Sequence, residues 1–163
     1  MSNNIQITWA TENDIPTILH FIKELAKYEK LEHEAIATAE SMKKNLFGDR
    51  KFAEVIFLEE SSKKVGFALF FHSFSTFLGA PGLYLEDLFV LPEYRGKGYG
   101  KKLLSTLAKI AVERECGRLE WSVLDWNQPA IDLYLSMGSK PMDEWTVHRV
   151  TGEALKNLAH QTI

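Results

Sequence analysis

The segment from Leu83 to Leu104, LYLEDLFVLPEYRGKGYGKKLL, constrains the fold of this chain most strongly. Its first part is apolar enough to form a buried strand, and Pro92 ends that strand because proline has no N–H to donate. Three glycines then stand at alternate positions, and an amphipathic helix is predicted from about Lys101. Glycines allow a sharp turn, and the unpaired N–H groups of a helix start attract anions. The segment therefore predicts a strand–turn–helix unit that binds an anion, most simply a pyrophosphate.

The glycine spacing excludes two common nucleotide-binding motifs. A P-loop has Ser or Thr after its lysine, whereas Lys101 is followed by Lys102. The dinucleotide fingerprint has the spacing G-x-G-x-x-G, whereas these glycines are spaced G-x-G-x-G. The run from Arg95 to Gly100 matches [RQ]-x-x-G-x-[GA] in full. It resembles the acyl-CoA pyrophosphate loop of the GCN5-related N-acetyltransferases, the GNAT family.

The resemblance extends over nearly the whole chain, from about Ile5 to Leu158. The segments KELAKYEKLE, LYLEDLFVLPEYRGKGYG and DWNQPAIDLYLSMG are similar to the diamine (spermidine/spermine) acetyltransferase branch, which includes enzymes that acetylate thialysine. This resemblance implies an α+β GNAT fold, with a mixed, mostly antiparallel sheet and helices on both of its faces. The implied order of elements is β-α-α-β-β-β-α-β-α-β.

Hydrophobic periodicity predicts the same order of elements. The expected strands cover residues 5–9, 52–58, 65–73, 83–91, 119–124 and 145–150, and the expected helices cover 14–28, 38–47, 101–116, 127–137 and 152–159. Residues 59–64 are expected to form a polar hairpin turn and residues 74–82 a loop. Since no linker or repeat divides the sequence, residues 1–163 are predicted to form a single N-acetyltransferase domain.

Composition limits the possible partners. A formal net charge of −3 argues against a general nucleic-acid binder. The sequence has no signal peptide and no apolar run long enough to cross a bilayer, so we expect a cytoplasmic protein without a membrane partner. The single cysteine cannot form an internal disulfide, and the five histidines show no metal-ligand spacing, so no metal is expected.

Glu86 and Asp87 interrupt an apolar strand just before the glycine turn. An alkyl amine with a pKa near 10 is mostly protonated at neutral pH, so its acetylation benefits from a proton acceptor. Adjacent strand residues point to opposite faces, so these two carboxylates are not expected to share one task. Each could instead pair with a neighbouring cation or lie at an exposed strand end. The resemblance implies that Glu86 accepts the amine proton, through water, and that Asp87 lies near the substrate cation.

Tyr134 is a candidate proton donor. By helical spacing alone a tyrosine at this position is more often a core residue, although a phenol can protonate a leaving thiolate. The segment from Trp126 to Tyr134 matches WN-x-P-[AS]-x-x-x-Y. Asn127 is expected to cap the helix at 127–137, with Pro129 in its first turn. The resemblance implies that Tyr134 is the general acid and that Asn127 also contacts the cofactor.

The resemblance also implies the remaining binding contacts. The backbone of residues 88–90 is expected to bind the pantetheine arm of acetyl-CoA, the co-substrate, as an added strand would. The residues expected to bind acetyl-CoA are Leu88, Phe89, Val90, Arg95, Gly96, Lys97, Gly98, Tyr99, Gly100, Lys101, Asn127, Pro129 and Tyr134. The residues expected to bind the amine are Tyr28, Glu29, Glu86 and Asp87. A solvated helix end is an equally simple interpretation of Glu29.

The loop before the central strand bears on the choice of amine. The polyamine acetyltransferases carry an acidic residue there, whereas residues 74–82, FSTFLGAPG, include no carboxylate. The Ser75-Thr76 pair is more similar to the thialysine-type branch. A short amine, or an amino acid side-chain amine, therefore fits at least as well as spermidine.

The favoured function is acetyl-CoA-dependent N-acetylation of a small primary amine by direct attack in a ternary complex. An acyl-enzyme is not expected, because Cys116 lies at a helix C-terminus, where the dipole disfavours a thiolate. The alternatives are a non-catalytic acetyl-CoA-binding sensor and a protein lysine acetyltransferase. The resemblance further implies a homodimer that meets through its C-terminal segments, with Trp145, Val147 and Val150 as contacts.

Overall fold

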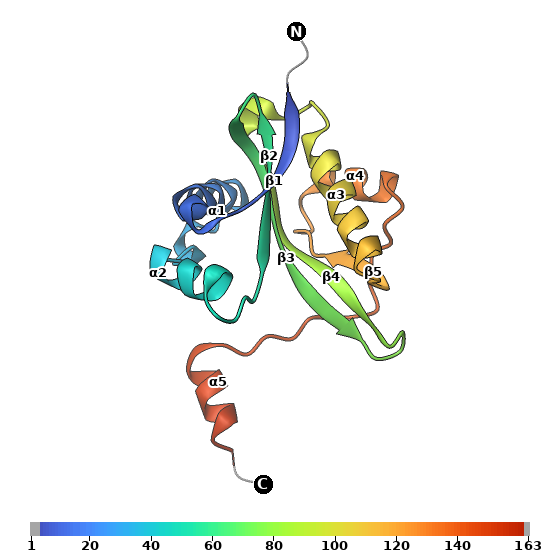
Figure 1. The fold of residues 1–163 in the computed structure, drawn as a ribbon. Helices are drawn as coiled ribbons and strands as arrows, with labels where there is room; N and C mark the ends of the chain where they lie inside the picture. Colours follow the sequence, from blue (N-terminus) through green and yellow to red (C-terminus); the bar gives the residue numbers. More distant parts are fainter. Residues whose placement is uncertain (1–3, 162–163) are drawn as a thin grey trace. The chain divides into compact units, whose positions relative to one another are not determined.

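The computed structural model describes residues 4–161 and contains a five-stranded sheet flanked by helices (Figure 1). The strands are β1 (Ile5–Trp9), β2 (Glu54–Glu60), β3 (Lys63–Ser75), β4 (Ala80–Val90) and β5 (Arg118–Trp121). The α-helices are α1 (Ile15–Glu29), α2 (Ala39–Met42), α3 (Tyr99–Glu113), α4 (Gln128–Ser136) and α5 (Gly152–Ala159). Short 3-10 segments are η1 (Glu12–Asp14), η2 (Glu32–Glu34) and η4 (Pro92–Tyr94), and a π-helical turn, η3 (Lys43–Phe47), continues α2.

The chain forms two compact units, one ending at Ser122 and the other beginning at Val123. The first unit contains the whole sheet together with α1, α2 and α3, and the second contains α4 and α5. The single domain expected from the sequence therefore stays a prediction.

The sheet has the strand order β1-β2-β3-β4-β5. The first four strands are antiparallel neighbours, and β5 pairs with β4 in parallel. A parallel neighbour needs a crossover connection, which α3 supplies after the glycine turn. The predicted α+β class with a mixed, mostly antiparallel sheet is confirmed.

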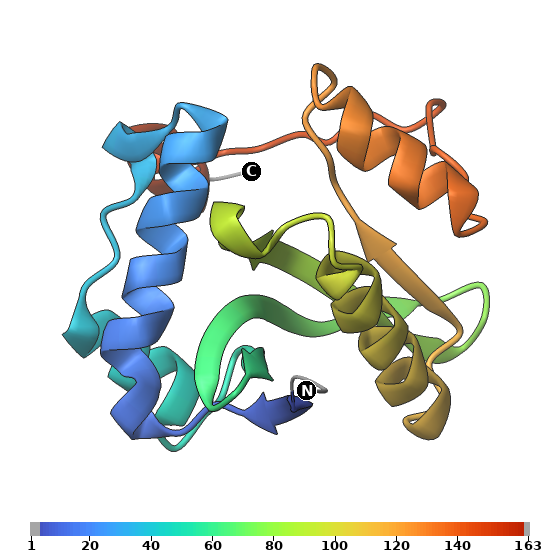
Figure 2. The same cartoon turned by 90° about the horizontal axis from the view of Figure 1, so that it is seen from above.

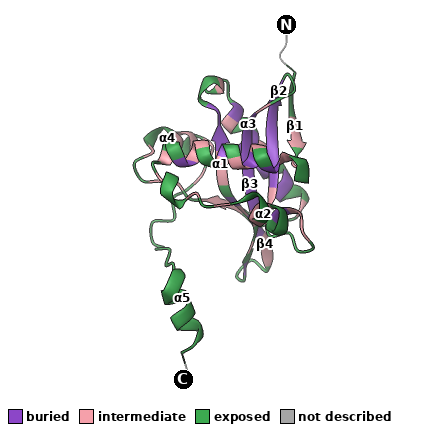
Figure 3. Cartoon of the chain, turned by 90° about the vertical axis from the view of Figure 1, so that its left-hand side faces the viewer, coloured by how far each residue is buried: buried purple, intermediate pink, exposed green. Residues whose placement is uncertain are grey.

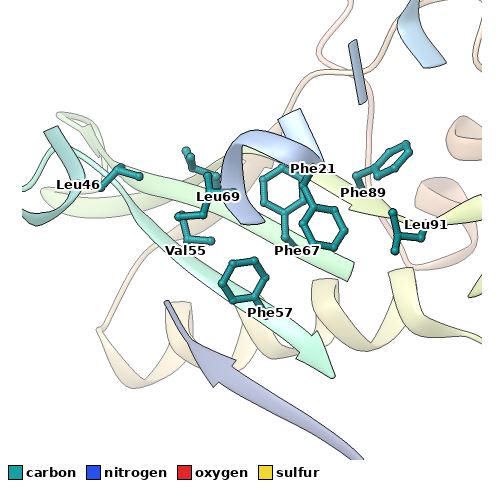
Figure 4. Close-up of a cluster of buried hydrophobic side chains, with 9 residues drawn as sticks. Phe21, Leu46, Val55, Phe57, Phe67, Leu69, Phe89 and Leu91 are labelled. Atoms are coloured by element: carbon teal, nitrogen blue, oxygen red, sulfur yellow. The ribbon is translucent and has the colours of Figure 1, made fainter. Parts of the chain in front are cut away.

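The sheet is covered on both faces within the first unit (Figure 2). On the α1 face, Phe21 stacks on Phe67 with ring centroids 5.0 Å apart, inside a cluster of buried side chains (Figure 4). This cluster consists of Ile18, Phe21, Leu46, Val55, Phe57, Phe67, Leu69, Phe89 and Leu91. On the other face α3 buries the predicted stripe of Leu103, Leu104, Leu107, Ile110 and Ala111. Burial on both faces explains why β2, β3 and β4 are apolar almost throughout.

The β2–β3 hairpin is tighter than predicted. Only Ser61 and Ser62 lie outside the strands, and both have positive φ, 50° and 66°. Two successive positive φ angles are typical of a type I′ turn, whose twist matches that of the flanking strands. Glu59 and Glu60, expected in an exposed turn, therefore lie in β2 and are buried. The predicted loop at 74–82 is likewise short, because β3 and β4 extend to Ser75 and from Ala80.

The predicted strand over residues 145–150 is wrong, because the structure forms neither a strand nor a helix there. The alternating apolar residues are present, but Trp145 and Val147 are 76% and 82% exposed. A strand is stable only when a neighbour pairs with it, and none does so among residues 4–161. The terminal helix, predicted at 152–159, is confirmed as α5 and is exposed along its length (Figure 3).

Candidate functional site

The glycine loop connects η4 to α3 and has the backbone geometry of an anion-binding turn. Gly96 and Gly98 have φ of +77° and +80°, which glycine adopts without strain. A Cβ atom at either position would meet no other atom within 4 Å. The helix begins at Tyr99, two residues earlier than predicted, and the first N–H groups of a helix have no acceptor within it. The loop therefore combines open space with unpaired N–H groups, which fits the predicted pyrophosphate site.

The two cationic side chains of the loop are bound by other groups of the protein. The Nε of Arg95 donates to the carbonyl of Val90 at 3.0 Å, and its guanidinium lies over the rings of Tyr28 and Phe89, 4.8 and 5.0 Å from their centroids. The Nζ of Lys97 donates to both carboxylate oxygens of Glu60, at 3.0 and 3.3 Å. Lys97 is therefore paired with a carboxylate, whereas a carbonyl and aromatic rings do not cancel the charge of Arg95. Arg95 can attract an anion together with the backbone N–H groups and with Lys101 and Lys102, which are exposed in the first turn of α3.

Glu60 is a residue of this region that sequence reasoning missed. Only 8% of it is exposed, and its carboxylate also accepts a short hydrogen bond from the hydroxyl of Tyr99. That hydrogen bond, together with burial, raises the pKa of Tyr99 to about 12. No clear signal for it is present in the sequence, because Glu60 stands in the polar run from Glu59 to Lys64, which is typical of a turn.

A β-bulge in β4 places the two predicted carboxylates. The β3–β4 ladder pairs Leu69 with Asp87 and Phe70 with Leu85, which leaves Glu86 as the extra residue. Asp87 thus lies on the α1 face with Leu69, whereas Leu85 lies on the α3 face with Phe70. A bulge re-aims the extra side chain, so the argument from strict alternation, which separated the tasks of Glu86 and Asp87, fails here.

The bulge lies beside the end of α1 and forms an acidic cluster with it: Glu29, Glu86 and Asp87. Burial raises the pKa of Asp87 to about 6, and the negative charges of Glu86 and Glu29 add to the shift. Burial also raises the pKa of Glu29, the last residue of α1. The neighbouring Tyr28 ring lies 6.3 Å from that of Phe89, so it borders the same region. A cation would stabilise these like charges, and this fits the predicted amine site.

The backbone of β4 has one side without a neighbouring strand beyond the bulge. Its ladder with β5 ends at the pair Leu85–Trp121, so in the described chain residues 87–90 pair with β3 alone. Phe89 and Val90 are buried and Leu88 is half-buried, as expected for core side chains whose backbone serves an added strand.

The second unit contains the other predicted residues. The side-chain oxygen of Asn127 accepts a hydrogen bond from the N–H of Ala130 at 3.4 Å, so the predicted cap of α4 is confirmed. Pro129 lies in the first turn, and Tyr134 is half-buried on the same helix. The role of Tyr134 as an acid and the contacts of Asn127 and Pro129 with a cofactor stay predictions, because α4 belongs to a separate unit.

Residues 4–161 show neither a metal site nor a membrane-spanning helix. No group of three or more His, Cys, Asp or Glu side chains there is arranged to hold a metal ion. In the same part of the chain, every helix is too short or too polar to cross a membrane.

Comparison with known proteins identifies the family. Residues 19–138 match the acetyltransferase (GNAT) family. The thialysine N-epsilon-acetyltransferase of Bos taurus is 37% identical, over 95% of this chain and 97% of that protein. The L-ornithine N5-acetyltransferase NATA1 of Arabidopsis thaliana is 34% identical, over 94% and 87%. An integron cassette protein from the mobile metagenome of V. cholerae has a similar structure, with a TM-score of 0.81 and 28% identity over 96% and 98% of the two chains. The chain therefore belongs to the acetyltransferase (GNAT) family.

Proposed function

We propose that this protein is an acetyl-CoA-dependent N-acetyltransferase that acts on a small primary amine. The observation that carries the proposal is the acidic cluster of Glu29, Glu86 and Asp87, since clustered carboxylates attract a cationic amine. The glycine loop follows in the same β4–α3 segment and suits the diphosphate of the co-substrate. The named activities of the relatives, which include acetylation of thialysine and of ornithine, support the same reaction.

The reaction proceeds by direct attack in a ternary complex. The amine nitrogen forms a bond to the thioester carbon, and the C–S bond breaks to release CoA. Glu86 accepts the amine proton through water, and Tyr134 donates its phenolic proton to the leaving thiolate. The products are the N-acetylated amine and CoA.

Binding is divided along the chain. The backbone of Leu88, Phe89 and Val90 holds the pantetheine arm, and the N–H groups from Gly96 to Lys101 hold the diphosphate. Asn127 and Pro129, at the start of α4, add contacts to the co-substrate. Asp87 and Glu29 stabilise a positive charge on the acceptor, beside the ring of Tyr28.

The acceptor is a short amine of the thialysine or ornithine kind. The turn between β3 and β4 supports this choice, because residues 74–82 include no carboxylate to bind the distant end of a long polycation. The names of the two relatives support it as well, since both describe amino acid side-chain amines.

The proposal is tested by measuring CoA release from acetyl-CoA with a panel of amines: thialysine, ornithine, lysine, putrescine, spermidine, spermine and a lysine-containing peptide. Fast release with thialysine or ornithine is the expected result. Preference for spermidine would mean that the acidic cluster suffices for a polycation, and preference for the peptide would indicate a protein acetyltransferase. Binding of acetyl-CoA without release for any acceptor would indicate a non-catalytic sensor.

Replacement of the proposed acid tests the chemical step. Tyr134→Phe should lower kcat about 10²-fold, the scale of general acid catalysis, with little change in the affinity for CoA. The measurement is steady-state kinetics combined with calorimetric titration of CoA. An unchanged kcat would exclude Tyr134 as the acid.

We further propose a cytoplasmic homodimer that meets through the C-terminal segments. Support comes from the exposed apolar side chains of Trp145, Val147 and Val150, since water-exposed apolar groups often mark contact surfaces. Light scattering should give twice the chain mass, and a monomer mass would contradict the proposal. No nucleic-acid or membrane partner is proposed.

A further inference from the structure

Glu60 contacts the residues on both sides of Gly98, where the loop becomes helix. Its carboxylate accepts hydrogen bonds from the Nζ of Lys97, at 3.0 and 3.3 Å, and from the hydroxyl of Tyr99. Gly98 itself has a left-handed backbone, and a Cβ there would meet no atom within 4 Å. Glu60 therefore contacts the side chains on both sides of the one loop position that joins the turn to the helix.

The carboxylate is anchored more firmly than a surface group. The side chain of Glu60 is 9% exposed and lies at the last position of β2, immediately before the two-residue turn. A buried carboxylate is stable only when cations or donors satisfy it, so Lys97 and Tyr99 are held to it strongly. Because β2 belongs to the central sheet, this links the loop to the rigid part of the unit.

We propose that Glu60 is a positioning residue for the diphosphate of acetyl-CoA. It fixes Lys97 and Tyr99, so that the N–H groups around Gly98 are arranged before the ligand arrives. Lys97 then acts through Glu60, and not as a direct phosphate ligand. This inference rests on one part of the proposed function, the binding of CoA by the glycine loop, and does not depend on acetyl transfer.

An alternative arrangement, in which Lys97 binds the phosphate directly, predicts the opposite change in CoA affinity for the variant Glu60→Gln. If Lys97 contacted the phosphate directly, Glu60 would compete for its charge, and Glu60→Gln would release Lys97 and tighten CoA binding. If Glu60 positions the loop, Glu60→Gln loosens Lys97 and weakens binding.

A double-mutant cycle on CoA affinity separates these cases. The variants are Glu60→Gln, Lys97→Met and the double variant, each titrated with CoA by calorimetry. Each single change should weaken binding about threefold to tenfold, because the ligand must then order the loop. The double variant should be no weaker than the weaker single variant, because both changes break the same pair. Tighter binding by Glu60→Gln, or effects that multiply in the double variant, would overturn the proposal.

A co-substrate without the diphosphate tests whether Glu60→Gln acts through diphosphate binding. With acetyl-CoA, Glu60→Gln should raise KM with kcat retained. With S-acetylpantetheine, which has no diphosphate, kcat/KM should match that of the unaltered protein. An equal loss with both substrates would mean a general structural role and would contradict positioning.

The neighbouring Glu59 provides the matched control. It is also 8% exposed in β2, but its carboxylate bonds to Gln6, Thr8 and Lys64, away from the loop. Glu59→Gln should lower the melting temperature without changing CoA affinity. If Glu60→Gln does not fold, Tyr99→Phe is the substitute variant, because it removes only the hydroxyl that bonds to Glu60. This variant should lower the affinity for CoA about twofold to threefold. An unchanged affinity would contradict the proposal.

The unaltered protein separates this inference from the proposed function. If it binds CoA but acetylates no amine, the proposed function fails and the cycle still decides the role of Glu60. If it does not bind CoA, the positioning proposal fails as well.

Discussion

The glycine loop before α3 and the bulge in β4 differ in how their charged side chains are paired. At the glycine loop, Arg95 lies against a carbonyl and two aromatic rings, and Lys97 pairs with Glu60. At the bulge, burial raises the pKa of Asp87, and the like charges of Glu86 and Glu29 raise it further. The cations of the loop are therefore held in place by the protein itself, and Lys97 is also paired with a carboxylate, whereas the acidic cluster retains an excess of negative charge. An anion can be bound by fixed backbone dipoles, while a cationic acceptor is bound by charges that the fold leaves uncompensated.

The largest effect is expected from removing the proposed base. Glu86→Gln should lower kcat/KM for the amine about 10²-fold near neutral pH, the scale of general base catalysis. The loss in kcat/KM should become smaller as the pH approaches the pKa of the amine, because more of the substrate is then already unprotonated and needs no proton acceptor. The measurement is a pH–rate profile of both proteins.

Glu93→Gln is a control for this change, because Glu93 is an exposed carboxylate in η4, outside the acidic cluster. Its profile should follow that of the unaltered protein. If Glu86→Gln lowers the rate by the same factor at every pH, Glu86 does not act as the base.

A smaller effect is expected on stability from Asp87. Its pKa is raised from 3.8 to about 6, so the folded protein binds a proton that the unfolded chain releases. Stability is therefore lost as the pH rises from about 4 through 6, and Asp87→Asn avoids this loss. The variant should gain about 2 kcal/mol in free energy of unfolding relative to the unaltered protein above pH 7, and little below pH 4.

Denaturant unfolding of both proteins between pH 4 and 8 measures this difference. Carboxylates with lowered pKa values, such as Glu54 and Glu59, occur in both proteins and cancel in the comparison. Saturation with a diamine should narrow the gap, because a bound cation stabilises the ionised Asp87. Parallel curves would mean that the pKa of Asp87 is not raised in the folded protein.

The smallest effect is expected at the loop. Gly98→Ala forces a residue with a Cβ into a left-handed conformation, which costs about 1–2 kcal/mol of conformational free energy. The affinity for CoA should fall about tenfold. Gly79→Ala is the matched control, because Gly79 has φ of +62° and similar open space in the distant β3–β4 turn. The two variants should lose similar stability, but only Gly98→Ala should lose CoA affinity. Equal affinities would show that the loop tolerates disorder.

Sequence reasoning succeeded where the physics is local. The glycine pattern predicted the turn before α3, and Asn127 with Pro129 predicted the start of α4, because caps and turns depend on a few adjacent residues. It failed where partners lie far apart in the chain. Glu60 looks like part of a polar turn until Tyr99 and Lys97 are placed beside it.

The bulge in β4 was not predicted, and the strand at 145–150 was predicted wrongly, for related reasons. An apolar run such as that of β4 has no alternation from which an extra residue could be detected, so the register appears only in the pairing with β3. Residues 145–150 do alternate, but alternation describes what a strand would bury and not whether a neighbour pairs with it.

The bulge also determines how this sequence can change in length. Leu83 and Leu85 precede Glu86 in β4, and Leu88 and Val90 follow it, and all four share the α3 face because the bulge accommodates one extra residue without inverting the alternation. Deletion of Glu86 would make the ladder regular, with Leu85 opposite Phe70 and Asp87 opposite Leu69 as before, and would leave the four apolar side chains on their face. Only the side chain that the bulge re-aims would be lost. Over evolutionary time, selection on core packing would therefore tolerate the loss of this residue, whereas selection on chemistry would act on both its presence and its identity.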